Sequence, residues 1–404
     1  MKILRIIARL NVGGPARHVV WLTEALNDGD FQTTLAAGSV PPGEDDMGYF
    51  AREHNVEPQI IQEMSREISP SDIRSLWKIY RLIKAEKPDI IHTHTAKAGT
   101  LGRAAGFLYK WLVPGTMIGR PRKVRVVHTF HGHVFHSYYS PAKTKIFLAI
   151  ERLLARFATD RIIVISNQQR EEISLTFNVG TPEQFDVIPL GIEVDTLQAR
   201  SDWRKEARRD IGLDADEIAI GFVGRLTEIK NIPLLLRTAC MFLGQEKIKF
   251  FIVGDGHMRG ELESEAKSLG LSDKVIFLGS RTNIAEVYSG LDIVALTSLN
   301  EGTPLSLIEA MAAGVPVIST GVGGVRDLLG EAVEFGDGFS ICERGVCIDT
   351  FIPEDFKNGL QYLIDRKESR ERLAEQGQKF VLANYGKDRL ISDIKGLYRN
   401  LNGK

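Results

Sequence analysis

The feature that most constrains the fold is an alternation of short apolar runs with longer amphipathic stretches along nearly all of the 404 residues. The apolar runs have the length of buried strands, and the stretches between them have the periodicity of helices. Strands that alternate with helices form parallel sheets with helices on both faces. The expected strands are residues 2–7, 32–37, 59–61, 89–95, 124–129, 161–166, 185–190, 218–223, 249–253, 275–278, 293–296 and 315–319.

A change of composition divides the alternation into two halves. Residues 193–216 are charged and weakly apolar, as in a linker with an entry helix, and the strand rhythm restarts at residue 218. We therefore predict an α/β protein with two Rossmann-like parallel-sheet domains, residues 1–196 and 197–386. Two such domains form a cleft between them, and ligands commonly bind in such clefts.

The bulk composition excludes several classes of protein. A hydrophobic content of 43% and a charged content of 25% are typical of a globular protein in water. The net charge of −1 gives no overall field for nucleic acid. Three cysteines form no disulfide framework, and no apolar segment approaches the ~20 residues that span a bilayer. These features predict a cytoplasmic protein that begins with a strand.

The segment after residues 293–296 joins a strand to a helix and carries two carboxylates. Thr303 suits a helix N-cap and Pro304 the first helical position, so Glu301 precedes free helix N–H groups. Those groups favour an anion such as phosphate. Glu309, inside the helix, suits two neighbouring hydroxyls of a ribose or a pyranose. A surface loop before an ordinary helix is the alternative.

Further polar turns follow other strands of the second half. Arg225 and Lys230 flank the loop after residues 218–223, and two cations at such a turn suit a diphosphate. Solvated surface cations are the alternative. Glycine turns at residues 254–256 and 321–324 also follow strands, where open α/β sheets bind ligands.

In the first half, the expected ligand-binding turns carry glycines and cations. Gly13 and Gly14 let the backbone approach a ligand, although they do not form the dinucleotide pattern G-x-G-x-x-G. Lys97 and Arg103 can meet an acidic substrate, or be solvated.

A histidine-rich segment follows the strand at residues 124–129. Four histidines lie between His128 and His136, which first suggests a metal site. The spacing does not match H-E-x-x-H, no acidic residue is present, and alternation directs His128 and His131 apart. We therefore predict that His131, beside Gly132, is a ligand-positioning histidine. A metal-dependent hydrolase is the alternative.

Aromatic residues and cations gather at residues 107–113 and 120–125. Such stretches can rest on an anionic membrane surface, although a helix end with a solvated loop has the same composition.

Three helices have a regular apolar pattern, from which we predict buried faces. The predicted buried residues are Ile73, Leu76, Trp77, Tyr80 and Ile83; Ile146, Phe147, Ile150, Leu153, Leu154 and Phe157; and Leu390, Ile391, Ile394 and Leu397.

At these motifs the chain strongly resembles the family-four retaining glycosyltransferases of the GT-B fold, over nearly its whole length. The residues that carry the resemblance are Glu301 with Glu309, Gly224-Arg225-Leu226 with Lys230, Val253-Gly-Asp-Gly256 and Thr129-Phe-His-Gly-His133. The surroundings of His131 resemble the subgroup that builds bacterial polysaccharides on lipid carriers. The resemblance also implies that residues 387–404 form a helix that crosses back to the first domain.

The resemblance implies a donor site for a nucleotide-sugar, most often a UDP-sugar, in the second domain. Arg225 and Lys230 would bind the diphosphate, Glu309 the ribose hydroxyls and Glu301 the sugar, with Arg281 near the base. Further donor contacts would be Gly14, Gly254, Gly302, Thr303 and Leu305. The acceptor would meet Gly13, Arg17, His18, Lys97 and His133.

The reaction implied is transfer of a hexosyl or N-acetylhexosaminyl unit to a glycan or lipid-linked acceptor, with retention. His131, Glu301, Arg225 and Lys230 form the expected catalytic group, and cations would replace a metal. No cofactor is expected, and Asp28-Gly-Asp30, between a helix end and a strand, is not expected to bind a metal. The alternative on the same fold is a nucleotide-sugar 2-epimerase.

Overall fold

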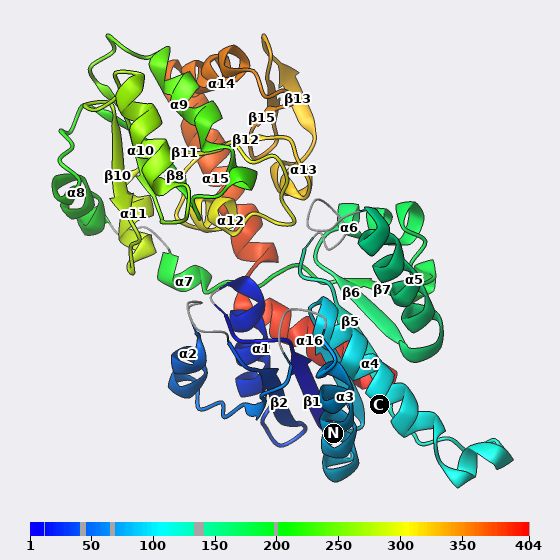
Figure 1. Ribbon diagram of the computed structural model, residues 1–404. Coiled ribbons are helices and arrows are strands. Elements are labelled where there is room, and N and C mark those ends of the chain that lie inside the picture. The colour runs from blue at the N-terminus through cyan, green and yellow to red at the C-terminus, as the bar shows by residue number, and fades with distance from the viewer. Residues whose placement is uncertain (12, 41–45, 65–68, 133–140, 198–200, 404) are drawn as a thin grey trace. The chain divides into compact units, whose positions relative to one another are not determined.

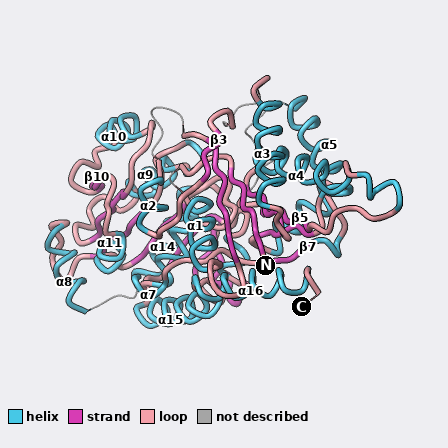
Figure 2. The backbone as a smooth tube through the Cα atoms, turned by 90° about the horizontal axis from the view of Figure 1, so that it is seen from below, coloured by secondary structure: helices cyan, strands magenta, loops and turns pink. Residues whose placement is uncertain are grey.

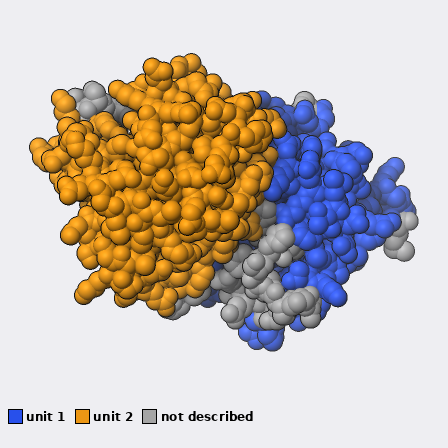
Figure 3. Space-filling model, turned by 90° about the horizontal axis from the view of Figure 1, so that it is seen from above, with its two compact units in different colours: residues 1–191, 387–404 blue, residues 192–386 orange. Residues whose placement is uncertain are grey.

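The chain divides into two compact units, each with its own sheet and core (Figures 1 and 3). The computed structural model describes residues 1–11, 13–40, 46–64, 69–132, 141–197 and 201–403. Unit 1 comprises residues 1–191 and 387–404, and unit 2 comprises residues 192–386. Unit 1 ends at Gly191 because Ile192 already pairs with Gly386, and its N–H donates to the Tyr385 carbonyl at 2.8 Å inside unit 2.

The sheet of unit 1 has seven parallel strands in the order β3-β2-β1-β4-β5-β6-β7. Its strands are β1 (Lys2–Ile7), β2 (Gln32–Gly38), β3 (Gln59–Ile61), β4 (Ile90–His94), β5 (Arg125–Thr129), β6 (Arg161–Val164) and β7 (Phe185–Val187). The predicted strands are confirmed, with ends that differ by a few residues. The order brings the carboxyl ends of β1, β4 and β5 side by side, which is where the site of unit 1 lies.

Helices cover both faces of this sheet (Figure 2). They are α1 (Gly14–Ala25), α2 (Gly48–Glu53), α3 (Asp72–Glu86), α4 (Ala96–Trp111), η1 (Pro114–Ile118), α5 (Pro141–Ala158), α6 (Asn167–Glu171), η2 (Glu172–Thr176), η3 (Pro182–Gln184) and α16 (Lys387–Leu401). The helix α4 packs between α3 and α5, whereas α16 shares a core with α1.

The last helix of the chain belongs to unit 1. Its Leu390, Ile394 and Tyr398 are fully buried. Lys395 bonds to Asp28 at 2.8 Å and Arg399 to Asp30 at 2.9 Å. The two carboxylates of Asp28-Gly-Asp30 therefore hold α16 in place.

Two predicted helix faces are wrong in part. On α5, Ile146, Leu153 and Phe157 were expected in the core, yet their side chains are 61%, 59% and 56% exposed. On α3, Ile73 and Trp77 are exposed by 75% and 57%. Periodicity shows that apolar residues share a face, but it does not show that another element covers that face.

The sheet of unit 2 has eight strands in the order β10-β9-β8-β11-β12-β15-β14-β13. Its strands are β8 (Ile218–Val223), β9 (Ile248–Val253), β10 (Val275–Gly279), β11 (Ile293–Leu296), β12 (Val317–Thr320), β13 (Ala332–Phe335), β14 (Ser340–Cys342) and β15 (Gly345–Ile348). The first six strands in this spatial order, from β10 through β12 to β15, are parallel. The strand β14 pairs antiparallel with β15, and β13 pairs antiparallel with β14; this extension was not predicted.

The helices of unit 2 follow the predicted alternation. They are α7 (Val194–Leu197), α8 (Ser201–Asp210), η4 (Glu228–Lys230), α9 (Ile232–Cys240), α10 (Arg259–Ser268), α11 (Ile284–Gly290), α12 (Leu305–Ala312), α13 (Val325–Leu329), α14 (Pro353–Asp365) and α15 (Lys367–Asn384). The predicted class, two Rossmann-like parallel-sheet domains, is confirmed. Among the described residues, no helix has the length and apolar character needed to cross a bilayer.

Candidate active site

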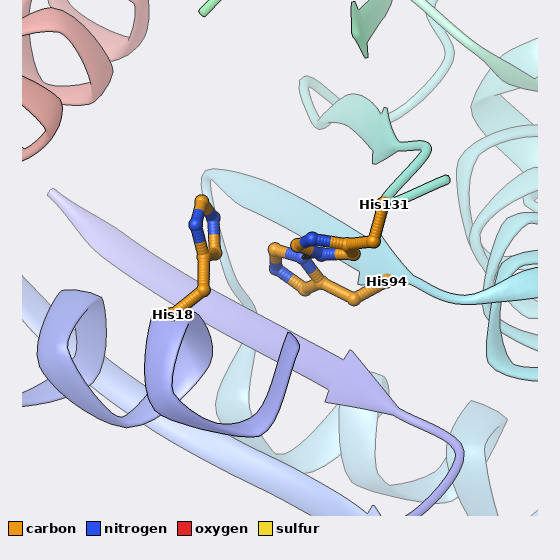
Figure 4. Close-up of side chains that lie close together, drawn as sticks. All are labelled: His18, His94 and His131. Carbon is orange, nitrogen blue, oxygen red and sulfur yellow. Dashed lines mark hydrogen bonds between the residues drawn. The ribbon is translucent and has the colours of Figure 1, made fainter. Parts of the chain in front are cut away.

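Three histidines meet at the carboxyl edge of the unit 1 sheet (Figure 4). His94 ends β4, His131 follows β5, and His18 lies on α1, which follows β1. The Nδ1 atom of His94 and the Nε2 atom of His131 form a hydrogen bond of 3.0 Å. The ring of His18 lies edge-on to His131, with 4.8 Å between centroids. Adjacent strands thus deliver three imidazoles to one point.

Burial keeps these imidazoles neutral. It lowers the pKa of His131 from 6.5 to about 4, and it lowers the pKa of His18 and of His94 well below the ordinary value. Both ring nitrogens of His18 are buried without a hydrogen-bond partner in the part of the chain that the structure describes. The same holds for Nε2 of His94 and Nδ1 of His131. Unpaired buried polar atoms are costly, so this cluster suits a ligand rich in hydroxyl groups.

The same cluster fits a metal ion less well. One nitrogen from each of His18, His94 and His131 can be chosen within 4.8 Å of the others. Ligands of one tetrahedral zinc, at 2.0–2.1 Å from the ion, lie only about 3.4 Å apart. The rings would therefore have to move together before they could share an ion.

Hydrogen bonds of the neighbouring His92 support the histidine cluster. The ring of His92 lies 4.1 Å from that of His94 between centroids. The Tyr398 hydroxyl lies 2.6 Å from Nδ1 of His92, and the Thr129 hydroxyl lies 2.7 Å from its Nε2. Because Tyr398 belongs to α16, the last helix of the chain helps to fix the histidines.

His128 points away from this cluster, as the alternation along β5 predicts. Its Nδ1 atom lies 2.8 Å from the Thr93 hydroxyl. A Cβ atom at Gly99 would lie 2.4 Å from its ring, so only glycine fits there. His128 therefore packs under α4 rather than at the site.

The other residues expected in unit 1 have mixed placements. Gly13 has a φ of +155°, Gly14 begins α1, and Arg17 is exposed. Lys97 forms an ion pair of 2.6 Å with Asp72 of α3, within unit 1.

Arg103 is likewise engaged within the fold, because it donates two bonds of 2.6 Å to the buried Glu151. It is not placed to meet an acidic substrate. His133 lies outside the described residues.

In unit 2, Lys230 and Glu301 form the centre of the site. Nζ of Lys230 lies 2.5 Å from Oε1 of Glu301, and the Ser298 hydroxyl donates to the same oxygen at 2.6 Å. The Thr297 hydroxyl donates to the Lys230 carbonyl at 3.0 Å. The loops after β8 and β11 are therefore joined through both side chains and backbone.

Close backbone contacts require two of the glycines in these loops. A Cβ atom at Gly254, whose φ is +131°, would lie 2.0 Å from the Gly224 carbonyl. A Cβ atom at Gly323, whose φ is +56°, would lie 1.7 Å from the Glu301 carbonyl. Four loops at this edge thus pack backbone against backbone, which leaves their amides and side chains to face a ligand.

Glu309 has a partner that sequence reasoning missed. The Tyr288 hydroxyl donates to Oε2 of Glu309 at 3.0 Å and lies 3.1 Å from the Ser306 carbonyl. Tyr288 is fully buried, and burial beside Glu309 raises its pKa well above 10.0. It belongs to no motif, and only its place in the fold connects it to the site.

The helix after Glu301 begins later than predicted. Pro304 is the capping residue, with a φ of −75° and an extended ψ of 104°, and Leu305 is the first helical residue. The prediction that Thr303 caps the helix and Pro304 begins it is wrong. Proline fixes φ but not ψ, and the extended ψ of Pro304 leaves Leu305 as the first residue with helical geometry.

The two remaining cations of the expected donor site are exposed. Arg225 forms no side-chain hydrogen bond or ion pair among the described residues, so its guanidinium is available to a ligand. Arg281 lines a pocket of unit 2 together with Leu278, Asn283 and Glu286. Their predicted contacts with diphosphate and base stay predictions.

Two protein families match the two halves of the chain. Residues 204–380 match the family described as glycosyl transferases group 1, and residues 12–196 match glycosyltransferase family 4. The chain is 32% identical over 298 residues, 72% of each protein, to an Escherichia coli UDP-Gal:alpha-D-GlcNAc-diphosphoundecaprenol alpha-1,3-galactosyltransferase. It is 25% identical over 336 residues to the N-acetyl-alpha-D-glucosaminyl L-malate synthase of Bacillus anthracis, covering 81% of this chain and 79% of that protein.

Solved structures share the fold. Anabaena HepE in complex with UDP superposes with a TM-score of 0.79 at 20% identity, covering 99% of this chain and 100% of HepE. The lipopolysaccharide glycosyltransferase WaaG gives a TM-score of 0.69 at 16% identity, covering 98% of this chain and 100% of WaaG. Fold and site together define a GT-B glycosyltransferase. The chain belongs to glycosyltransferase family 4.

Proposed function

We propose that the protein transfers a hexosyl or N-acetylhexosaminyl unit from a UDP-sugar to a lipid-linked glycan, with retention, in bacterial surface polysaccharide synthesis. The observation that carries the proposal is the Lys230–Glu301 pair at the loop edge of a glycosyltransferase sheet. The E. coli relative is named for a UDP-galactose donor and a diphosphoundecaprenol acceptor, and HepE has been solved with UDP and with UDP-glucose.

In this proposal, unit 2 binds the donor and stabilises its leaving group. As the bond to the sugar breaks, negative charge collects on the diphosphate. Arg225, Lys230 and the amides before α12 supply positive potential at that position. Glu301, held by Lys230 and Ser298, binds the sugar with the N–H groups of Gly302, Thr303 and Leu305. Glu309, oriented by Tyr288, accepts the ribose hydroxyls.

Unit 1 binds the transferred sugar and the acceptor through neutral groups. His131 contacts a hydroxyl of the sugar, and His18 contacts the acceptor. Neutral imidazoles can donate and accept hydrogen bonds without competing with the cations for the diphosphate. The backbone at Gly13 and Gly14 approaches the donor phosphates. The departing phosphate oxygen takes the proton of the acceptor hydroxyl, so the new bond forms on the face that the diphosphate leaves.

We propose that the reaction uses no metal or other cofactor, because Arg225 and Lys230 supply the positive charge that a divalent ion supplies elsewhere. We expect EDTA to leave the transfer rate unchanged. A rate that falls with EDTA and returns with Mg²⁺, Mn²⁺ or Zn²⁺ would contradict this part of the proposal.

The proposal is tested first by ligand binding. A ligand at one hundred times its dissociation constant stabilises the native state by about 2.7 kcal/mol, which raises the melting temperature. We expect UDP and one UDP-sugar to raise it more than GDP- or ADP-sugars do. Product that forms from the UDP-sugar without any acceptor would instead identify the protein as a 2-epimerase.

A further inference from the structure

One stretch of unit 1 has a charge composition unlike that of the whole protein. Between Asp89 and Asp160 the chain carries eleven lysines and arginines but one carboxylate, Glu151, whereas the net charge of the chain is −1. Glu151 is buried and already bonded to Arg103. Lys97 also pairs with Asp72, and Lys110 and Arg125 pair with Asp160. The other cations of the stretch give its outer surface a positive surplus.

The helix α5 carries an apolar stripe on its exposed side. Ile146, Leu153 and Phe157 are spaced by seven and four residues, so at about 100° per residue they lie within about 40° of one another. All three are more than half exposed, with exposed fractions of 61%, 59% and 56%.

Three cations lie beside that stripe on the same helix. Lys145, Arg152 and Arg156 are exposed and lie together on one side of it by the same helical spacing. An exposed helix face of apolar residues flanked by lysine and arginine is the pattern of helices that lie in a membrane interface.

A second set of apolar and basic side chains lies on the neighbouring segment. The helix α4 packs against α5, and the end of α4 with η1 projects from the rest of unit 1 (Figure 1). On this projection Trp111, Leu112 and Ile118 are 38%, 65% and 72% exposed. Arg120 and Lys123 follow at once and are also exposed. Aromatic rings beside cations are enriched at the headgroup level of bilayers.

We propose that these two sets form one membrane-docking surface, through which unit 1 rests on an anionic bilayer. We call it the α4–α5 surface; its apolar members are Trp111, Leu112, Ile118, Ile146, Leu153 and Phe157. Its basic members are Arg120, Lys123, Lys145, Arg152 and Arg156.

An anionic bilayer fits this surface better than other partners do. Nucleic acid would pair with the cations, but it would leave the aliphatic side chains in contact with water. A second copy in a symmetric dimer would place this positive face against itself. Only a surface that combines negative headgroups with an apolar interior satisfies both kinds of side chain. The inference rests on the proposed function in one respect, namely that the acceptor is anchored to a lipid.

The test is sedimentation of the full-length protein with vesicles. We expect binding to phosphatidylcholine vesicles that contain phosphatidylglycerol, little binding to pure phosphatidylcholine, and weaker binding at high salt. Lys145→Glu with Arg156→Glu should lower the partition coefficient by about 25-fold or more, at about fivefold per cation. Ile146→Ser with Leu153→Ser and Phe157→Ser should lower it at least about tenfold, because apolar burial is lost.

The matched control replaces exposed apolar residues elsewhere on the chain. Val333→Ser with Phe335→Ser and Phe351→Ser removes side chains of unit 2 that are 59%, 78% and 46% exposed. This variant should bind vesicles as the wild type does. Equal binding to both lipids, no binding, wild-type binding by the surface variants, or an equal loss in the control would overturn the proposal. So would a dimer that only the surface variants dissociate.

A separate assay distinguishes this inference from the proposed function. The surface variants should transfer sugar to a water-soluble, short-chain acceptor at the wild-type rate, because their substitutions lie outside the site. They should lose activity only with acceptor in anionic vesicles. If the wild type binds vesicles but transfers no sugar, the proposed function is refuted and the membrane-docking surface is supported. If it transfers sugar but does not bind vesicles, the proposed function is supported and the membrane-docking surface is refuted.

Discussion

In both units the candidate site lies at the carboxyl edge of a parallel sheet, but the side chains at that edge differ in charge. In unit 2 the loops carry charges: Lys230 bonded to Glu301 at 2.5 Å, and an exposed Arg225. In unit 1 the corresponding loops carry imidazoles whose burial lowers their pKa, so that they are uncharged at neutral pH. We infer from this comparison that unit 2 stabilises the charge of the leaving group and that unit 1 recognises hydroxyl groups.

The largest expected effect is in unit 2. Lys230→Ala removes a cation and leaves Glu301 without its closest partner, so we expect the transfer rate to fall by about 1000-fold or more. Arg225→Ala should lower it by about 100-fold. The matched control is Arg237→Ala, an exposed cation on α9, which should keep the wild-type rate. Full activity in both site variants, with melting temperatures unchanged, would remove the charge-stabilising role of unit 2.

A smaller effect is expected in unit 1. His131→Ala should lower kcat by about 100-fold, because one neutral hydrogen-bonding group to the sugar is lost. His94→Ala, which removes only the partner at 3.0 Å from His131, should cost about tenfold. Steady-state kinetics with saturating UDP-sugar measures both. A larger loss for His94→Ala than for His131→Ala would contradict the proposed order of the two residues.

The loss of the Tyr288 hydroxyl should be milder still. Tyr288→Phe removes the bond to Glu309 and keeps the buried ring, so the donor KM should rise by about tenfold while kcat changes little. Isothermal titration with UDP gives the same quantity without chemistry. Unchanged UDP affinity would show that Glu309 needs no support from Tyr288.

An effect of a different kind is expected on stability, and it distinguishes unit 1 from unit 2 by its dependence on pH. The folded state holds His131 with a pKa of about 4 instead of 6.5, so between these values the unfolded state binds more protons. Stability is therefore complete above pH 6.5 and falls as the pH falls toward 4. Through His131 the free energy of unfolding falls by at most about 1.4 kcal/mol per pH unit within that window. In His131→Asn, thermal melts should show a shallower decline; an identical decline would contradict the assignment.

The sequence predicts the sheets well because their strands are buried apolar runs separated by helices. It misses the extension of unit 2 because no helix separates β13, β14 and β15, and all four residues of β13 are exposed. It misjudges α5 because apolar spacing identifies a face but not what covers that face. The exposed side chains of that helix lead instead to the α4–α5 surface.

In the candidate site, too, some residues could be predicted from the sequence and others could not. Lys230 and Glu301 are visible in the sequence because they follow strands in short motifs, and Glu309 is visible because it follows Glu301 by eight residues. Tyr288 lies on another helix, and only the fold brings its hydroxyl to Glu309. His94 stands in a strand that ends in polar residues, but its role depends on the ring of His131, 37 residues away in the chain.

The position of α16 has a consequence for biosynthesis. Unit 2 is an uninterrupted segment, residues 192–386, whereas unit 1 needs residues 387–404 to complete its core around Leu390, Ile394 and Tyr398. A ribosome delivers the chain from its N-terminus, and domains fold as units during synthesis. Unit 1, most of which is made first, therefore cannot complete its core until α16 has been made. Unit 2 can finish folding before unit 1 does. Until residues 387–404 have been synthesised and α16 has packed, His92 lacks Tyr398, so the histidine cluster matures after unit 2 has been made.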